Sequence, residues 1–181
     1  LASETVTKAI VQYIEDHPRG EPHWDRLSQY IQQQLLDQLD KHPEAANMGT
    51  TAVFAYFGDN TLWIANVGDS RAYHIRSEDE FWYTKDHSLV RQLYDKGKLQ
   101  SEEEMEMHPQ SNVVTRAFQA TPHKSPPQFD VQEISNVQSG DILFICSDGV
   151  LEPFSVHSHV EILCDDSRSF EESAEMIQNT C

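Results

Sequence analysis

Residues 50–84 carry a pattern of hydrophobicity that few folds can accommodate. Short runs rich in aromatic and β-branched residues follow one another, separated only by brief turn sequences, at 50–57, 62–67, 71–76 and 81–84. Such runs are typical of β-strands, and the short connections predict that consecutive strands pair as an antiparallel meander. In the first two runs both alternating faces are apolar, which predicts a sheet covered on both sides.

Helical patterns precede these strands. Apolar residues recur three and four positions apart over 6–14, with Ser3 as a candidate N-cap. A second apolar stripe over 24–39 ends just before Pro43, because a residue that precedes proline disfavours the helical conformation. Two amphipathic helices are therefore predicted at the start of the chain.

The second half of the chain mixes both kinds of element. The pattern predicts a helix at 88–96 that ends at Gly97, an acidic helix start at 101–104, a hairpin of two strands at 131–134 and 141–146 around a turn at Ser139-Gly140, and a partly helical tail after Gly149. Together with the first half, this order predicts one α+β layered domain over residues 1–181.

Composition narrows the classes of function. The chain has 181 residues, of which 38% are hydrophobic, enough to build a core. Its formal charge of −17 excludes nucleic acids and anionic membranes as natural partners, because both are polyanions. The acidity serves solubility or, alternatively, marks a carboxylate-rich site for divalent cations.

The cysteines and the hydropathy indicate the compartment. Cys146, Cys164 and Cys181 are odd in number, widely spaced and without a CxxC pair, which disfavours a disulfide framework and a zinc site. No apolar stretch approaches the roughly 20 residues that span a bilayer. We therefore expect a cytoplasmic protein that does not enter a membrane.

Two aspartates are candidates for metal chemistry. Asp148 follows the apolar run 142–146 and precedes Gly149, so its carboxylate is well placed to hold a hard cation. Asp69 lies between two predicted strands in the sequence Gly-Asp-Ser-Arg. The alternatives are ordinary turn aspartates that bond their own backbone or, for Asp69, an ion pair with Arg71.

Other catalytic motifs are missing from the sequence. It contains no HExxH, GxSxG, Walker loop or GxGxxG, so a zinc hydrolase, a serine triad and a nucleotide-binding loop have no support. His157 and His159 are two positions apart, which places them on different faces of a helix. His87 and His108 lie beside candidate loops, where substrate contact and an ordinary polar role are both open.

Five blocks of sequence carry a resemblance to a known family. They are NMGTTAV at 47–53, LWIANVGDSRAY at 62–73, TKDHSLV at 84–90, HPQSNVVTRA at 108–117 and GDILFICSDG at 140–149. In this order they resemble the successive signatures of type-2C Ser/Thr protein phosphatases. The His-Pro-Gln and Asp-His-Ser-Leu-Val forms are similar to those of the bacterial branch.

The resemblance implies a fold and an activity. The fold is a four-layer α-β-β-α sandwich of two antiparallel sheets flanked by helices. The activity is hydrolysis of phosphoserine and phosphothreonine on proteins by a metal-activated water at a binuclear Mn²⁺ or Mg²⁺ centre, with no catalytic side chain that attacks phosphorus. Asp148 matches a ligand of this centre, and Asp69 matches an aspartate that helps hold a third metal ion. Residues 88–107 match a mobile flap beside the active site, whereas Thr50 and Thr51 match residues that support the sheet.

The matched blocks leave the family's metal site incomplete. The Asp-Gly-(Met or His)-Gly signature and a phosphate-binding Arg belong before residue 1, and the Asp-Asn signature belongs after residue 181. Glu152 stands where many relatives carry an acidic residue. We expect these residues to be part of a complete phosphatase, with little activity by themselves. The alternative is a metal-free pseudophosphatase that binds phosphoproteins without hydrolysing them.

The resemblance also implies the partners. Phosphorylated proteins, modified by a Ser/Thr kinase, are the expected partners of either an active phosphatase or a pseudophosphatase. We expect the protein to be a monomer.

Overall fold

The computed structural model describes residues 1–18, 20–58, 61–151 and 155–180. The middle of the turn predicted after Gly58, and the positions of Glu152 and Cys181, lie outside the described residues. Within the described part, no helix combines the length and the apolar character needed to cross a membrane.

The strands form two antiparallel sheets of three. In the first sheet the order is β2 (Ala52–Gly58), β3 (Thr61–Val67) and β7 (Asp130–Ile134). In the second sheet it is β5 (Glu80–Tyr83), β4 (Arg71–Ser77) and β8 (Ile142–Cys146). A separate two-stranded ladder joins β1 (Gly49–Thr50) to β6 (Phe118–Gln119).

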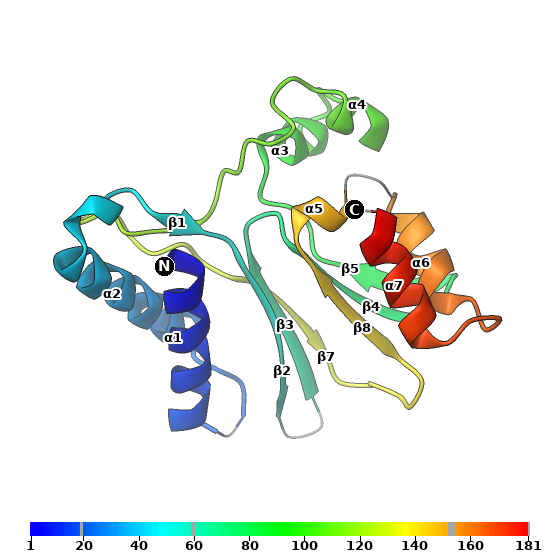
Figure 1. Cartoon of the computed structure of the whole chain (residues 1–181), viewed down its shortest axis with the longest axis horizontal. Helices are drawn as coiled ribbons and strands as arrows, with labels where there is room; N and C mark the ends of the chain where they lie inside the picture. Colours follow the sequence, from blue (N-terminus) through cyan, green and yellow to red (C-terminus); the bar gives the residue numbers. More distant parts are fainter. Residues whose placement is uncertain (19, 59–60, 152–154, 181) are drawn as a thin grey trace.

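Helices cover the outer faces of both sheets. The described helices are α1 (Ala2–Asp16), α2 (Trp24–Lys41), the 3₁₀ turn η1 (Pro43–Ala45), α3 (Leu89–Asp95), α4 (Glu102–Glu106), α5 (Asp148–Leu151), α6 (Val156–Cys164) and α7 (Phe170–Thr180). Figure 1 shows α1 and α2 on one side of the sheets and α6 and α7 on the other, while α3 and α4 project from one end. The predicted α-β-β-α sandwich is confirmed.

Each interface between layers has its own apolar cluster. Between the first two helices and the first sheet lie Val6, Ala9, Tyr13, Leu27, Ile31, Leu35, Val67 and Phe118. Between the sheets lie Leu62, Ile64, Ala72 and Ile134. Between the second sheet and α6 and α7 lie Tyr73, Ile75, Cys146, Val160, Leu163 and Ile177. The side chains on the two faces of β3, and those on the two faces of β4, thus belong to different clusters. This is expected for strands that are covered on both faces, because successive side chains point to opposite faces.

Two predictions about strand connections are wrong. β2 pairs with β3 and β4 pairs with β5 as predicted, but β3 and β4 lie in different sheets, so the predicted meander is interrupted between Val67 and Arg71. β7 pairs with β3 and β8 pairs with β4, so the predicted hairpin at 131–146 does not exist either. Apolar periodicity shows that a strand is buried on both faces, but it does not specify which sheet supplies the partner.

The helix ends are close to the predicted ones, with one exception. α2 begins at Trp24 and ends just before His42, and Gly97 follows α3 with a φ of +69°. α1, however, begins at Ala2 with Leu1 in the N-cap position, so the predicted cap Ser3 lies inside the first turn.

His159 makes the stability of the interface between the second sheet and the helices α6 and α7 depend on pH. It is fully buried on α6 beside the rings of Tyr73 and Phe144, and its Nε2 lies 3.1 Å from the Val150 carbonyl oxygen. Burial lowers the pKa of this imidazole below its usual range. As the pH falls below about 6.5, the unfolded chain takes up this proton before the folded chain does, so the free energy of unfolding decreases.

We predict that His159→Gln, which keeps a donor toward Val150 but cannot titrate, removes part of this decrease. The difference amounts to at most about 1.4 kcal/mol per pH unit. Urea denaturation of both proteins between pH 7.5 and pH 5 measures it. Equal slopes for the two proteins would contradict the assignment.

Candidate active site

The crossover between the two sheets carries Asp69. Gly68 ends β3 with a φ of +119°, and a Cβ atom at this position would lie 2.2 Å from Cγ2 of Thr51. Thr51 Oγ1 also lies 3.0 Å from Ser70 Oγ, so Thr51 supports the crossover on both sides of Asp69. Only glycine satisfies both the backbone conformation and the close approach.

The segment between β5 and α3 forms hydrogen bonds with this crossover on both of its sides. Thr84 N donates to the carbonyl of Ala72 at 3.0 Å, and Ala72 N donates to Thr84 Oγ1 at 3.1 Å. Three residues further on, His87 N donates to the carbonyl of Gly68 at 2.8 Å, and Gly68 N donates to His87 Nδ1 at 2.9 Å. The chain on either side of Asp69 is therefore held by one continuous segment, Thr84 to Ser88.

Arg71 and Asp86 form a bidentate ion pair within this arrangement. Arg71 Nε and Nη2 each donate to one carboxylate oxygen of Asp86 at 2.7 Å, and the two side chains are 18% and 14% exposed. Burial opposes the charge of Arg71, but the hydrogen bonds and the attraction of Asp86 outweigh it and raise the pKa of the guanidinium. The alternative that Arg71 forms an ion pair with Asp69 is therefore wrong.

Asp148 reaches the same region from the second sheet. It directly follows the segment Ile142–Cys146 and Ser147, is the first residue of α5, and its Oδ1 accepts a hydrogen bond from Gly149 N at 3.0 Å. Asp69 and Asp148 line one pocket of about 440 Å³. The fold thus brings together the two aspartates that the sequence singled out.

The pocket has an excess of negative charge. Its acidic residues are Asp69, Asp86, Glu102, Glu106 and Asp148, and its basic residues are Arg71, Lys85 and Arg91. Burial raises the pKa of Asp69, and the negative charges of Asp148 and Asp86 raise it further. A carboxylate in this situation is stabilised by a cation, and carboxylate oxygens are the ligands that Mg²⁺ and Mn²⁺ prefer.

The two aspartates supply only part of a metal site. Hard divalent cations take about six oxygen ligands, several of which are commonly waters. Across the residues that the structure describes, no group of three or more His, Cys, Asp or Glu side chains is placed to hold a metal ion. The donor chemistry of Asp69 and Asp148 fits the cation, while their number leaves further ligands to be supplied from elsewhere.

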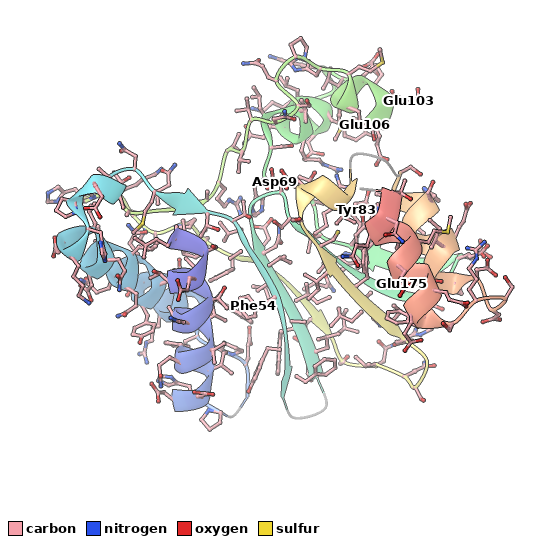
Figure 2. The ribbon with its side chains drawn as sticks, in the orientation of Figure 1. Phe54, Asp69, Tyr83, Glu103, Glu106 and Glu175 are labelled. Atoms are coloured by element: carbon pink, nitrogen blue, oxygen red, sulfur yellow. The ribbon has the colours of Figure 1, made fainter. Side chains whose placement is uncertain are left out.

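A helical projection borders the pocket. Ser88 caps α3 and Ser101 caps α4, each by accepting a hydrogen bond from a backbone N–H three residues later. Tyr83 OH donates to Glu102 Oε1 at 3.3 Å and so links α4 to the second sheet. Figure 2 shows Glu103 and Glu106 on this projection, with Asp69 at the nearby end of the sheets. Residues 88–107 thus occupy the place expected of the flap.

The histidines show how far the sequence was informative. His87 is buried and His108 accepts a hydrogen bond from Gln110 N at 3.1 Å, so both bond within the chain. Nothing in the sequence indicated that Asp86 pairs with Arg71 or that His87 bonds to Gly68. The block TKDHSLV at 84–90, one of the five that carry the family resemblance, was nevertheless a signal that pointed to this segment.

Comparison with known proteins agrees with the fold and with the family resemblance of the sequence. The sequence model of the family described as Protein phosphatase 2C matches residues 5–93. The Serine/threonine protein phosphatase PstP of Mycobacterium tuberculosis is 31% identical over 165 residues, which cover 90% of this chain and 31% of PstP. Protein phosphatase PhpP of Streptococcus pneumoniae is 36% identical over 136 residues, 75% of this chain and 53% of PhpP.

Solved structures give the same result. The serine/threonine phosphatase Stp1 of Staphylococcus aureus superimposes with a TM-score of 0.80 at 26% identity, covering 98% of this chain and 69% of Stp1. The catalytic domain of PstP in complex with two manganese ions superimposes with a TM-score of 0.73 at 27% identity, covering 99% and 73%.

The fold is the one found in bacterial Ser/Thr protein phosphatases of the 2C type. The chain belongs to the protein phosphatase 2C family. It spans about a third of the length of PstP and about half of the length of PhpP.

The close approach at Gly68 leads to a stability prediction. Gly68→Ala combines the strain of a positive φ with overlap against Thr51, so we expect the free energy of unfolding to fall by about 3 kcal/mol or more. Gly97→Ala is the matched control, because Gly97 has a φ of +69° but no atom within 4 Å of the added Cβ. We expect it to cost about 1 kcal/mol. Urea denaturation measures both losses, and similar values would contradict the role of Thr51.

The Arg71–Asp86 pair leads to a second prediction. Asp86→Asn leaves a largely buried guanidinium without its counter-charge, so we expect a loss of about 3 kcal/mol in the free energy of unfolding. Asp95→Asn removes a more exposed i,i+4 pair with Arg91 and is expected to cost less than about 0.5 kcal/mol. Thermal or urea denaturation compares them. If Asp86→Asn costs no more than Asp95→Asn, the ion pair does not hold the crossover.

Proposed function

We propose that the protein containing this chain hydrolyses phosphoserine and phosphothreonine on other proteins with the aid of Mn²⁺ or Mg²⁺. The observation that carries the proposal is the meeting of Asp69, from the crossover between the sheets, and Asp148, from the end of the second sheet, in one negatively charged pocket. It is supported by membership of a family whose characterised relatives are Ser/Thr protein phosphatases, and by the two manganese ions in the structure of the PstP catalytic domain.

In this proposal the chain supplies part of a binuclear centre. Asp148 holds one of two cations, and Asp69 helps hold a third. When bound, the cations would lower the pKa of a water molecule and offset the negative charge of the phosphoryl group. Arg71 is engaged by Asp86, so its role is to hold the crossover in place rather than to bind phosphate.

The charges of the pocket are consistent with a phosphorylated substrate only when cations are present. The net negative charge of the pocket would repel a phosphate dianion, and cations held by Asp69 and Asp148 would offset this repulsion. The substrates would be proteins modified by a Ser/Thr kinase, and we place the reaction in the cytoplasm. The 181 residues by themselves would have little activity, because they contribute two carboxylates to the centre.

One observation favours a second candidate function. The described residues contain no group of three metal-ligating side chains, as would also be found in a pseudophosphatase that binds phosphoproteins without hydrolysing them. Such a protein would bind a phosphothreonine peptide but release no phosphate at any metal concentration.

The test is hydrolysis of 4-nitrophenyl phosphate and of a phosphothreonine peptide by the whole protein over a series of Mn²⁺ concentrations. We expect Mn²⁺-dependent turnover that Asp148→Asn lowers by at least about 100-fold, since loss of even an outer-shell partner of a metal ligand commonly costs 10- to 100-fold. Asp69→Asn should mainly raise the Mn²⁺ concentration needed for half-maximal rate. Glu175→Gln, on the outer helix α7, is the control and should leave the rate unchanged.

The outcomes separate the two candidates. Peptide binding without phosphate release would replace the enzyme by the pseudophosphatase. Turnover that is independent of Mn²⁺ and Mg²⁺, or unaffected by Asp148→Asn, would overturn the metal-centre proposal.

A further inference from the structure

His87 bonds to both sides of Gly68, the residue that precedes Asp69. The side chain accepts a hydrogen bond at Nδ1 from Gly68 N, 2.9 Å away, and the backbone N donates to the carbonyl of Gly68, 2.8 Å away. The first bond fixes the peptide plane before the Gly68 Cα, and the second fixes the plane after it. Since glycine has the greatest backbone freedom of any residue, these two bonds determine both of its dihedral angles.

The plane after Gly68 includes the N–H of Asp69. The orientation of this peptide sets the direction in which the chain continues to the Asp69 Cα, from which the carboxylate projects toward the pocket. The orientation of the carboxylate is therefore coupled to the orientation of the Gly68–Asp69 peptide, and through that peptide to His87.

The imidazole is itself held on its other side. Because Nδ1 accepts a hydrogen bond, the ring proton resides on Nε2, which lies 3.0 Å from Oδ2 of Asp130. The His87 carbonyl accepts hydrogen bonds from Thr115 N at 2.7 Å and from Thr115 Oγ1 at 2.9 Å. The side chain is only 7% exposed, so it has neither space nor solvent to exchange these partners.

We propose that His87 is a positioning residue of the active site, which acts through Gly68 to direct the Asp69 carboxylate toward the pocket that it shares with Asp148. This inference rests on the proposed function, because it takes Asp69 to be a metal ligand. His87 does not contact substrate or metal. The hydrogen bond to Nδ1 restricts the backbone of Gly68 in advance, so this conformational entropy does not have to be lost when the cation binds.

Two substitutions separate the roles of the two ring nitrogens, because each retains the contact of one nitrogen and removes that of the other. In His87→Asn the amide oxygen can take the position of Nδ1, so the bond from Gly68 N is retained and the contact with Asp130 is lost. In His87→Gln the amide nitrogen can take the position of Nε2, so the contact with Asp130 is retained and the acceptor for Gly68 is lost. Asp130→Asn weakens the Asp130 contact while leaving the imidazole in place.

The experiment measures the Mn²⁺ requirement of phosphate-ester hydrolysis by the whole protein. We expect His87→Gln to raise the half-saturating Mn²⁺ concentration about tenfold with the rate at saturating Mn²⁺ nearly retained, as loss of one hydrogen bond would do. His87→Asn and Asp130→Asn should each change it by less than about threefold. In an Asp69→Asn background, His87→Gln should have no further effect, because the residue through which it acts is gone.

A second readout does not depend on activity. Hydrogen exchange at the Gly68 amide reports directly on its bond to Nδ1, and we expect about tenfold faster exchange in His87→Gln but not in His87→Asn. This result would stand even if the protein showed no metal-dependent hydrolysis, so failure of the proposed function is distinguishable from failure of this inference.

Three results would overturn the inference. The first is an equal Mn²⁺ requirement, or equal Gly68 exchange, in His87→Gln and His87→Asn. The second is a full effect of His87→Gln in the Asp69→Asn background. If His87→Gln does not fold, the third decides: a tenfold change in the Mn²⁺ requirement of His87→Asn or Asp130→Asn would show that the Nδ1 bond is not the one that matters.

Discussion

At Gly68 the chain leaves one sheet for the other, and its backbone passes so close to Thr51 that a Cβ atom would lie 2.2 Å from Cγ2. This passage joins the two sheets whose facing side chains form the central apolar cluster. It also determines the position of Asp69 at the end of the sandwich, because Gly68 directly precedes this residue. Any displacement of Gly68 would therefore alter both the packing of the sheets and the position of a candidate metal ligand.

The charged side chains around the crossover differ in their burial and in whether an opposite charge neutralises them. The most buried pair, Arg71 and Asp86, is mutually neutralised by a bidentate contact. Asp69 and the exposed Asp148 have no such counter-charge among the interactions described for them, and the pKa of Asp69 rises as a result of burial and of its acidic neighbours. The structural ion pair thus differs from the candidate ligand carboxylates, because Arg71 is already neutralised by Asp86 and does not pair with Asp69.

Much of the fold could be predicted from the sequence. The two N-terminal helices, the positions of the strands β2, β3, β4, β5, β7 and β8, and the burial of strands on both faces follow from the period of apolar residues. The alternation in β3 shows why: Leu62 and Ile64 face the second sheet, while Val67 faces the helices. The pairing of strands could not be predicted in this way, because an apolar face is equally satisfied by a helix layer or by a second sheet.

For the candidate site, the sequence by itself determined the chemistry of Asp69 and Asp148, the glycines beside them and the signatures that carry the family resemblance. Only the tertiary structure decided that these aspartates share a pocket, that Arg71 pairs with Asp86 rather than with Asp69, and that His87 holds Gly68. Residue type and local spacing fix what a side chain can do. Which partner it meets depends on contacts between segments far apart along the chain, and these form only when the sheets pack together.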